Sequence, residues 1–261
     1  MSFERGVMML SYKTSGQPAN PSILFLHGGG LSGKMWDDVT KLLQEHYYCI
    51  VPDLPGHGDS SSITPLTADK CVEELTPFLS QYGPVHIVGL SMGGILAQKL
   101  LETSPDSIQS VIITGSSPQL SAFKVALINM LVAPTYRFMS SKKMTASMMK
   151  GLSIPEAYAY DIELDMEKVT PSTMREMYGL MKEIKVPTPS THPLLVLAGE
   201  REGALVRNNV RKLLAALPNS KGAIVPGLNH AWSYENPQLF AEVVETWIEE
   251  GEVHEGLIRF I

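Results

Sequence analysis

The feature that most constrains the fold is a regular alternation of short apolar runs with longer segments of helical periodicity. Continuous apolar strands joined by helices are typical of a mostly parallel sheet that is covered by helices on both faces. We predict sheet strands at Ile23 to Leu26, Tyr47 to Pro52, Val85 to Leu90, Ile108 to Thr114, Leu194 to Ala198 and Gly222 to Val225, and an edge strand at Val7 to Tyr12. The predicted helices between them lie at about Met35 to Glu45, Thr67 to Tyr82, Met92 to Glu102, Ala204 to Ala216 and Pro237 to Glu250.

The alternation stops after Ser117 and resumes at Thr191. Between these points the sequence contains helical stretches and no convincing strand: Ser121 to Ala133, Ser140 to Lys150, Pro155 to Glu163 and Pro171 to Ile184. We therefore predict that residues 118–190 form a helical insertion, and that residues 1–117 and 191–261 together form one α/β core.

Size and charge exclude several classes of protein. A chain of 261 residues with 44% apolar residues can bury a core without metal ions or disulfides. The net charge of −6 gives no attraction to phosphate backbones, and the only cationic run is the pair Lys142 and Lys143, so we expect no nucleic-acid partner. The apolar stretch Val125 to Tyr136 is too short to span a bilayer.

The amino-terminal residues and the cysteines predict a compartment. The first twenty residues hold charged side chains and lack the apolar run and small-residue cleavage site of a secretory signal peptide, so we do not predict one. The two cysteines, Cys49 and Cys71, fit a reducing environment and small buried side chains. We expect a cytoplasmic protein.

A glycine-rich segment, residues 89–93 with the sequence Gly-Leu-Ser-Met-Gly, closes a predicted strand and opens a helix. A serine on so tight a turn needs glycines two positions before and after it, because side chains there would collide. The turn projects the Ser91 hydroxyl clear of the sheet and points a helix amino terminus at developing negative charge. We predict Ser91 as a nucleophile; the alternative is a glycine-rich turn with an inert serine.

A serine hydroxyl is a weak nucleophile alone, so this chemistry needs a base and an acid that orients the base. Residues 199–202, Gly-Glu-Arg-Glu, follow one predicted strand, and His230 follows the last predicted strand. The carboxyl ends of strands in an open α/β sheet meet at one edge, where ligands bind. We predict His230 as the base and Glu202 as the acid, with Glu200 as the alternative acid.

Residues 27–30, His-Gly-Gly-Gly, also follow a predicted strand. Backbone N–H groups can face an oxyanion only where side chains leave the approach open, which glycine ensures. We predict that the N–H groups of Gly29 and Met92 form an oxyanion hole, with Gly30 as the alternative to Gly29. A phosphate-binding loop is the competing interpretation, but the segment lacks Gly-Lys-Ser/Thr and does not match Gly-x-Gly-x-x-Gly.

Taken together, these residues resemble the α/β-hydrolase superfamily, in its single-domain esterase branch with a helical cap. The resemblance covers nearly the whole chain. It includes residues 27–29, the segment 53–60 (Asp-Leu-Pro-Gly-His-Gly-Asp-Ser), the Ser91 turn, Glu202, and His230 followed by Glu-Asn-Pro at 235–237. It implies an eight-stranded sheet, a cap inserted after the sixth strand, and a triad of serine, acid and histidine.

Two positions depart from the usual pattern of this superfamily. Glu202 stands where aspartate is usual, although a glutamate can still accept the imidazole N–H. Asn229 stands before the histidine where glycine is common, and asparagine tolerates a left-handed backbone better than other residues with a side chain. The remaining polar residues of the family turns, His27, His57 and Asp53, are expected to hold loops together.

The resemblance and the residues together predict a serine hydrolase that cleaves a carboxylic ester through an acyl-enzyme intermediate. A carbon–carbon bond hydrolase, a thioesterase or a lactonase could use the same triad. A receptor that holds a ligand on the same fold without turnover is the alternative that is not an enzyme. We expect no cofactor and no metal, because His-Glu-x-x-His, Cys-x-x-Cys and Asp-rich loops are absent from the sequence. The protein is expected to be a monomer or a homodimer.

Methionine is concentrated in the predicted insertion. It holds nine of the 14 methionines: Met130, Met139, Met144, Met148, Met149, Met166, Met174, Met177 and Met181. Methionine is unbranched and polarizable, so it fills irregular or changing gaps. Some of these side chains are expected to line an adaptable apolar pocket above Ser91, for an ester with an apolar acyl or alcohol part; the alternative is simple packing of the insertion onto the core.

Overall fold

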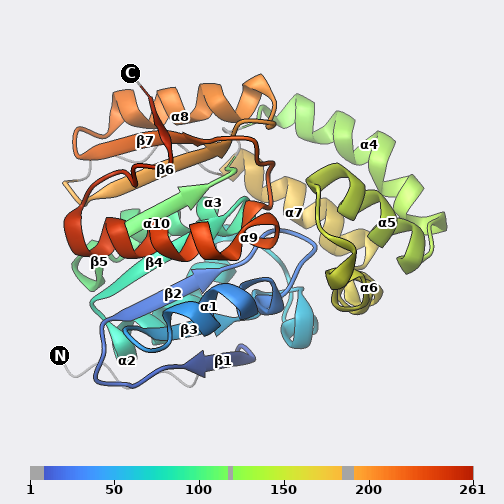
Figure 1. Ribbon diagram of the computed structural model, residues 1–261. Helices are drawn as coiled ribbons and strands as arrows, with labels where there is room; N and C mark the ends of the chain where they lie inside the picture. Colours follow the sequence, from blue (N-terminus) through green and yellow to red (C-terminus); the bar gives the residue numbers. More distant parts are fainter. Residues whose placement is uncertain (1–8, 117–119, 184–190, 261) are drawn as a thin grey trace.

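A computed structural model of the protein describes residues 9–116, 120–183 and 191–260 (Figure 1). Its centre is an eight-stranded sheet in the order β1-β3-β2-β4-β5-β6-β7-β8. The strands are β1 Tyr12–Ser15, β2 Ser22–Leu26, β3 Tyr48–Pro52, β4 Val85–Leu90, β5 Ile108–Thr114, β6 Leu194–Gly199, β7 Ser220–Val225 and β8 Ile258–Arg259. Neighbouring strands from β3 to β7 are parallel, while β1 and β8 pair antiparallel at the edges.

Alternate side chains of the central strands pack into two separate hydrophobic cores. On β2, Ile23 and Phe25 face one core, and Leu24 and Leu26 face the other. This alternation follows from the two-residue period of a strand, and it explains why the strands are apolar at every position. The prediction of a mostly parallel sheet with both faces covered is confirmed.

Helices cover both faces of the sheet. Helices α1 (Asp37–Leu43) and α10 (Pro237–Glu250) lie over one face, and α2 (Ala68–Tyr82), α3 (Met92–Thr103) and α8 (Ala204–Ala216) lie over the other. Helix α10 begins as the sequence predicts, since the Asn236 side chain accepts a hydrogen bond from the Leu239 N–H and Pro237 occupies the first turn.

The insertion forms four helices between β5 and β6: α4 (Ala122–Phe138), α5 (Ser141–Leu152), α6 (Ala159–Lys168) and α7 (Pro171–Glu183). We call these four helices the cap. Figure 1 shows them gathered at the end of the sheet where the parallel strands end. No helix in the described parts of the chain is long and apolar enough to cross a membrane.

Two details differ from the sequence-based expectations. The cap follows the fifth described strand rather than the sixth, because the eighth strand, β8, lies at the other end of the chain, where no apolar run predicted it. The amino-terminal strand is Tyr12–Ser15, and residues 7 and 8 of the predicted edge strand lie outside the described residues. The predicted boundaries of the insertion also fall at residues 117–119 and 184–190, outside the described parts.

Polar contacts dock the cap onto loops at the carboxyl ends of the core strands. The buried carboxylate of Asp165 on α6 accepts a hydrogen bond of 2.8 Å from the Ser32 N–H. On the neighbouring turn of α6, Asp161 pairs with the Lys34 ammonium at 3.0 Å. On α7, the Glu176 carboxylate accepts from the Leu66 N–H at 2.9 Å. The loop that carries the predicted oxyanion glycines is therefore held by the cap as well as by the core.

Replacing Asp165 with asparagine is expected to change how stability depends on pH. Burial raises the pKa of Asp165 to about 6, whereas an aspartate in an unfolded chain titrates near pH ~4. Between these values the native state holds a proton that the unfolded state has lost, so the free energy of unfolding falls as the pH rises. Asparagine keeps an oxygen for the Ser32 N–H but cannot ionise. The unfolding free energy of the variant relative to the wild type should therefore rise by about 3 kcal/mol from pH ~4 to pH ~7.

Urea unfolding of both proteins across this pH range measures the difference directly. Asp106→Asn, at an exposed aspartate of the core, is the matched control and should track the wild type at every pH. A difference between Asp165→Asn and wild type that does not change with pH would contradict the desolvation of this carboxyl group.

Candidate active site

Ser91 lies between β4 and α3, in a backbone conformation that is rare for a residue with a side chain. Its φ is 53° and its ψ is −111°. The glycines on either side are required by packing: a Cβ on Gly93 would collide with the Leu26 carbonyl, and a Cβ on Gly89 would lie 2.6 Å from the Gly93 backbone. The structure thus has the tight turn that the sequence predicts, with Ser91 at its apex.

Hydrogen bonds from the end of β5 hold this strained turn. The Ser91 N–H donates to the Thr114 carbonyl at 2.9 Å, and the Ser116 hydroxyl donates to the Ser91 carbonyl, also at 2.9 Å. The side-chain amide of Asn209 in turn donates to the Ser116 carbonyl at 2.9 Å. Sequence reasoning missed these residues, because they reach the turn from elsewhere along the chain: Thr114 and Ser116 from the end of β5, and Asn209 from α8.

The structure brings His230 and Glu202 together. Imidazole Nδ1 and carboxylate Oε1 lie 2.5 Å apart, and the Glu202 side chain is almost fully buried. The other carboxylate oxygen accepts a hydrogen bond of 2.7 Å from the Gly199 N–H. Glu200 points elsewhere, because its carboxylate accepts from the Gly227 N–H at 2.7 Å. Of the two candidate acids, the geometry therefore favours Glu202.

Gly115, at the end of β5, makes room for this pair. Its φ is +63°, and a Cβ at this position would lie 2.9 Å from Nδ1 and Cε1 of His230 and 3.3 Å from Oε1 of Glu202. Any side chain here would displace the imidazole or the carboxylate. Sequence analysis did not single out this glycine, since its role depends on loops that are far away along the chain.

Asn229, the residue before the histidine, ties the histidine loop to the cap. Its side-chain amide donates to the Ser153 hydroxyl at 2.9 Å, and its N–H donates to the Glu235 carboxylate at 2.7 Å. The left-handed residue of this loop is Gly227, with φ +68°, and not Asn229. Position 229 therefore does not require a residue that tolerates a left-handed backbone.

The two histidines of the family turns are buried and bonded to backbone. Nδ1 of His27 donates to the Gly28 carbonyl at 2.9 Å, and its Nε2 accepts from the Leu54 N–H at 2.8 Å. Nδ1 of His57 contacts the Pro55 carbonyl at 2.9 Å. Burial lowers the pKa of His27 to about 4 and that of His57 to about 3. Both rings are therefore neutral near pH ~7, in keeping with a role in holding loops.

The Asp53 carboxylate also bonds to backbone: it accepts hydrogen bonds from the Gly33 N–H and the Asp59 N–H, each at 2.8 Å. A Cβ on Gly58, whose φ is +50°, would collide with the Asp53 carboxylate. This carboxylate therefore organises the loop after β3, as the sequence analysis expects.

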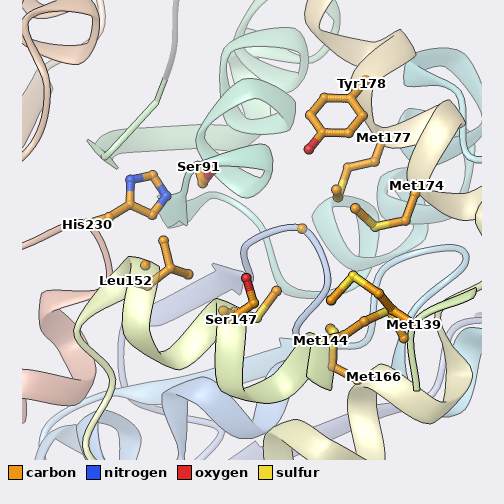
Figure 2. Close-up of a pocket in the computed structure, with 13 residues that line it drawn as sticks. Ser91, Met139, Met144, Ser147, Leu152, Met166, Met174, Met177, Tyr178 and His230 are labelled. Carbon is orange, nitrogen blue, oxygen red and sulfur yellow. The ribbon is translucent and has the colours of Figure 1, made fainter. Parts of the chain in front are cut away.

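A cavity of about 510 Å³ lies between the core and the cap, with Ser91, Gly29 and His230 in its wall. Figure 2 shows the His230 ring on the same side of the cavity as Ser91, opposite a group of methionine side chains from the cap. Six of the nine cap methionines line it: Met139, Met144, Met148, Met166, Met174 and Met177. The volume is in the range of small-molecule sites. The expected methionine-lined space above Ser91 is present.

Two of these methionines lie against the predicted oxyanion glycines. A Cβ on Gly29 would collide with the Met177 sulfur, and a Cβ on Gly30, whose φ is +78°, would lie 2.7 Å from the Met148 methyl group. The absence of a side chain at these two glycines is therefore required by their close contact with the cap. Met92 is buried in the first turn of α3, directly after Ser91.

In the parts of the chain that the structure describes, no three histidine, cysteine, aspartate or glutamate side chains form a group that could hold a metal ion. The polar side chains that line the cavity include the hydroxyls of Ser91, Ser147 and Tyr178 and the His230 imidazole with a buried carboxylate behind it, and the backbone of Gly29 lies in the same wall. This set can activate a hydroxyl as a nucleophile and stabilise an oxyanion.

Comparisons with known proteins identify the family and the fold of the chain. The family model of the alpha/beta hydrolase family matches residues 23–243 of the chain. An AB hydrolase superfamily protein of Gibberella zeae is 27% identical over 258 residues, which cover 93% of this chain and 85% of that protein. A pimeloyl-[acyl-carrier protein] methyl ester esterase of Aeromonas hydrophila is 24% identical over 261 residues, which cover 92% of this chain and 100% of that protein. The solved structure of a thermophilic esterase from Thermogutta terrifontis matches with a TM-score of 0.76 and 22% identity, covering 92% of this chain and 93% of that one.

Proposed function

The chain belongs to the alpha/beta hydrolase family, and we propose that it is a serine hydrolase that cleaves a carboxylic ester through an acyl-enzyme intermediate. The observation that carries the proposal is the His230 imidazole, which lines the same cavity as Ser91 while its Nδ1 lies 2.5 Å from the buried Glu202 carboxylate. With Nδ1–H donated to the carboxylate, Nε2 is left free to accept a proton.

In this proposal Ser91 attacks the ester carbonyl while His230 Nε2 takes the hydroxyl proton. Glu202 orients the imidazole and stabilises the imidazolium that forms. The N–H groups of Gly29 and Met92 hold the oxyanion of the tetrahedral intermediate. His230 then protonates the leaving alcohol, and an acyl group remains on Ser91. Water, activated by the same imidazole, attacks the acyl group and releases the acid.

We propose an ester with an apolar acyl or alcohol part as the substrate. The cavity wall is rich in thioether side chains, which are apolar and adapt their shape at little strain. A series of p-nitrophenyl esters with increasing acyl length tests both the reaction and the substrate class. Steady turnover that rises with acyl length supports the proposal, and a strict preference for acetate would contradict the apolar acyl pocket.

Met177→Ala is expected to shift this acyl-length preference. The Met177 sulfur lies against Gly29, so removing it widens the cavity next to the predicted oxyanion hole. The ratio of kcat/KM for long acyl chains to kcat/KM for acetate should rise about tenfold, since one or two methylene groups gained in an apolar pocket are worth that much. The matched control is Met130→Ala, because Met130 is exposed on α4 and should leave the ratio unchanged. An unchanged ratio in Met177→Ala would contradict a position for this side chain beside the acyl group.

The same triad could serve a thioester, a lactone or a carbon–carbon bond, and the same ester panel extended to these compounds separates them by kcat/KM. A receptor would show one slow turnover with retained product instead of steady release. The proposed location is the cytoplasm, in keeping with a chain that holds only two cysteines, Cys49 and Cys71, both of them buried.

A further inference from the structure

Among the described side chains of helix α4 in the cap, apolar residues lie on two opposite faces, and those of one face are exposed. Val125, on the inner face, is 3% exposed, and α4 packs against α7. The outer face carries Phe123, Leu127, Met130 and Phe138, which are 78%, 41%, 64% and 85% exposed. Figure 1 shows α4 along the outer edge of the cap. An apolar face of a helix is normally buried against another element or in contact with lipid.

The spacing of these four side chains places them in one row. Phe123, Leu127 and Met130 follow one another at intervals of four and three residues, and Phe138 continues the row two turns later. We call these four residues the outer face of α4. Single exposed apolar residues need no explanation, but four on one side of a helix, two of them largely exposed phenylalanines, mark an interaction surface.

The stretch of sequence that carries the outer face holds charges of one sign. From residue 107 to residue 155 the sequence contains no aspartate or glutamate and five cations, in a chain whose net charge is −6: Lys124, Arg137, Lys142, Lys143 and Lys150. Exposed lysines lie at both ends of the row. Lys124 follows Phe123, and Lys142 and Lys143 follow Phe138 at the start of α5. The partner of this surface must therefore combine an apolar layer with negative charge.

We propose that the outer face of α4 docks the protein on the surface of an anionic lipid membrane. Large apolar side chains on one helical face with lysines at its borders are the pattern of a helix that lies in the membrane interface. Phosphate headgroups attract the lysines, and the phenylalanine rings enter the acyl boundary. A second copy of this chain fits less well, because a two-fold contact through this face would bring two cationic surfaces together. Phe138 precedes Met139, which lines the cavity, so docking would bring the cap and its pocket to the lipid.

Co-sedimentation with vesicles tests this proposal. The full chain should sediment with vesicles of phosphatidylcholine mixed with phosphatidylglycerol, bind vesicles of phosphatidylcholine alone far less, and dissociate as salt is added. A variant with Phe123→Ser and Phe138→Ser should bind the anionic vesicles at least about tenfold more weakly, since each ring loses its burial in the interface. A variant with Lys124→Glu and Lys142→Glu should lose at least about fivefold for each lysine.

The matched control replaces an exposed leucine and an exposed lysine on core helix α8, as Leu205→Ser with Lys212→Glu. It should bind vesicles as the wild type does. All variants should hydrolyse a short soluble ester at the wild-type rate if the ester-hydrolase proposal holds, and circular dichroism reports folding independently of that proposal.

Three outcomes would overturn the docking proposal. Equal binding of the wild type and the phenylalanine variant to anionic vesicles is the first. A wild type that is dimeric by light scattering while the phenylalanine variant is monomeric would assign the face to a second copy. Binding to an acidic carrier protein through these residues, with no binding to vesicles, would assign it to a protein partner.

Discussion

Ser91→Ala is expected to abolish ester hydrolysis, with kcat about 10⁴- to 10⁶-fold below the wild type. The proposed reaction forms its covalent intermediate on the Ser91 oxygen, which no other hydroxyl can replace, because Ser91 alone sits at the strained apex between β4 and α3. Residual activity should come only from binding and the oxyanion hole. Rates with a p-nitrophenyl ester, and the mass of the acid-quenched enzyme, measure the loss of turnover and of the acyl adduct.

The control for this prediction is a second serine of the same cavity. Ser147 on α5 lines the cavity from the cap side. Ser147→Ala should keep turnover within about twofold of the wild type, since no part of the chemistry uses it. Near-wild-type hydrolysis by Ser91→Ala would refute the nucleophile assignment, and an acyl adduct on a peptide without Ser91 would do the same.

The second large effect is expected for Glu202→Gln. A glutamine amide cannot stabilise the imidazolium, and its NH₂ group favours the wrong tautomer of His230, so kcat should fall about 10⁴-fold. KM should change little, because Glu202 is buried behind the imidazole and does not line the cavity. Steady-state kinetics separate the two parameters. Glu202→Asp, which keeps the carboxylate, should recover part of the loss.

Glu200→Gln is the natural comparison, because Glu200 is the other glutamate of the same loop. Its carboxylate bonds to the Gly227 N–H at 2.7 Å, and a glutamine oxygen can accept the same bond. This variant should keep kcat within about threefold of the wild type. If Glu200→Gln were the inactive variant and Glu202→Gln the active one, the acid would be assigned to the wrong glutamate.

The strand and helix pattern predicted the core well because each element depends on its own sequence. The run Leu194–Ala198 is apolar at every position, and it forms the fully buried strand β6. Helix α10 begins and ends at the residues predicted from its Asn-Pro start. Strand β8 was missed, since Ile258–Arg259 is two residues long and exposed, and only its pairing with β7 makes it a strand.

Local sequence also identified the tight turn that carries Ser91 in the candidate site. The glycines around Ser91 are dictated by contacts within the turn and with the next strand, so their spacing carries the information. Gly115, Ser116 and Asn209 could not be found this way. Ser116 and Asn209 support the Ser91 turn through hydrogen bonds between residues that lie 25 and 93 positions apart along the chain. Gly115, which has no side chain, leaves the space that His230 and Glu202 occupy.

The sequence by itself determined the α/β architecture, the helical insertion and the three segments that carry Ser91, His230 and the two glutamates. Only the tertiary structure shows that the Glu202 carboxylate contacts His230 while the Glu200 carboxylate bonds the Gly227 N–H, which is why we propose Glu202 as the acid. The two glutamates are two residues apart in one loop, and that loop is pinned by a bond of 3.0 Å from the Arg201 N–H to the Leu228 carbonyl. Which carboxylate then faces His230 depends on the direction of each side chain. The hydrophobic periodicity of a segment indicates which of its residues are buried. Contacts between loops depend instead on how all the elements pack together.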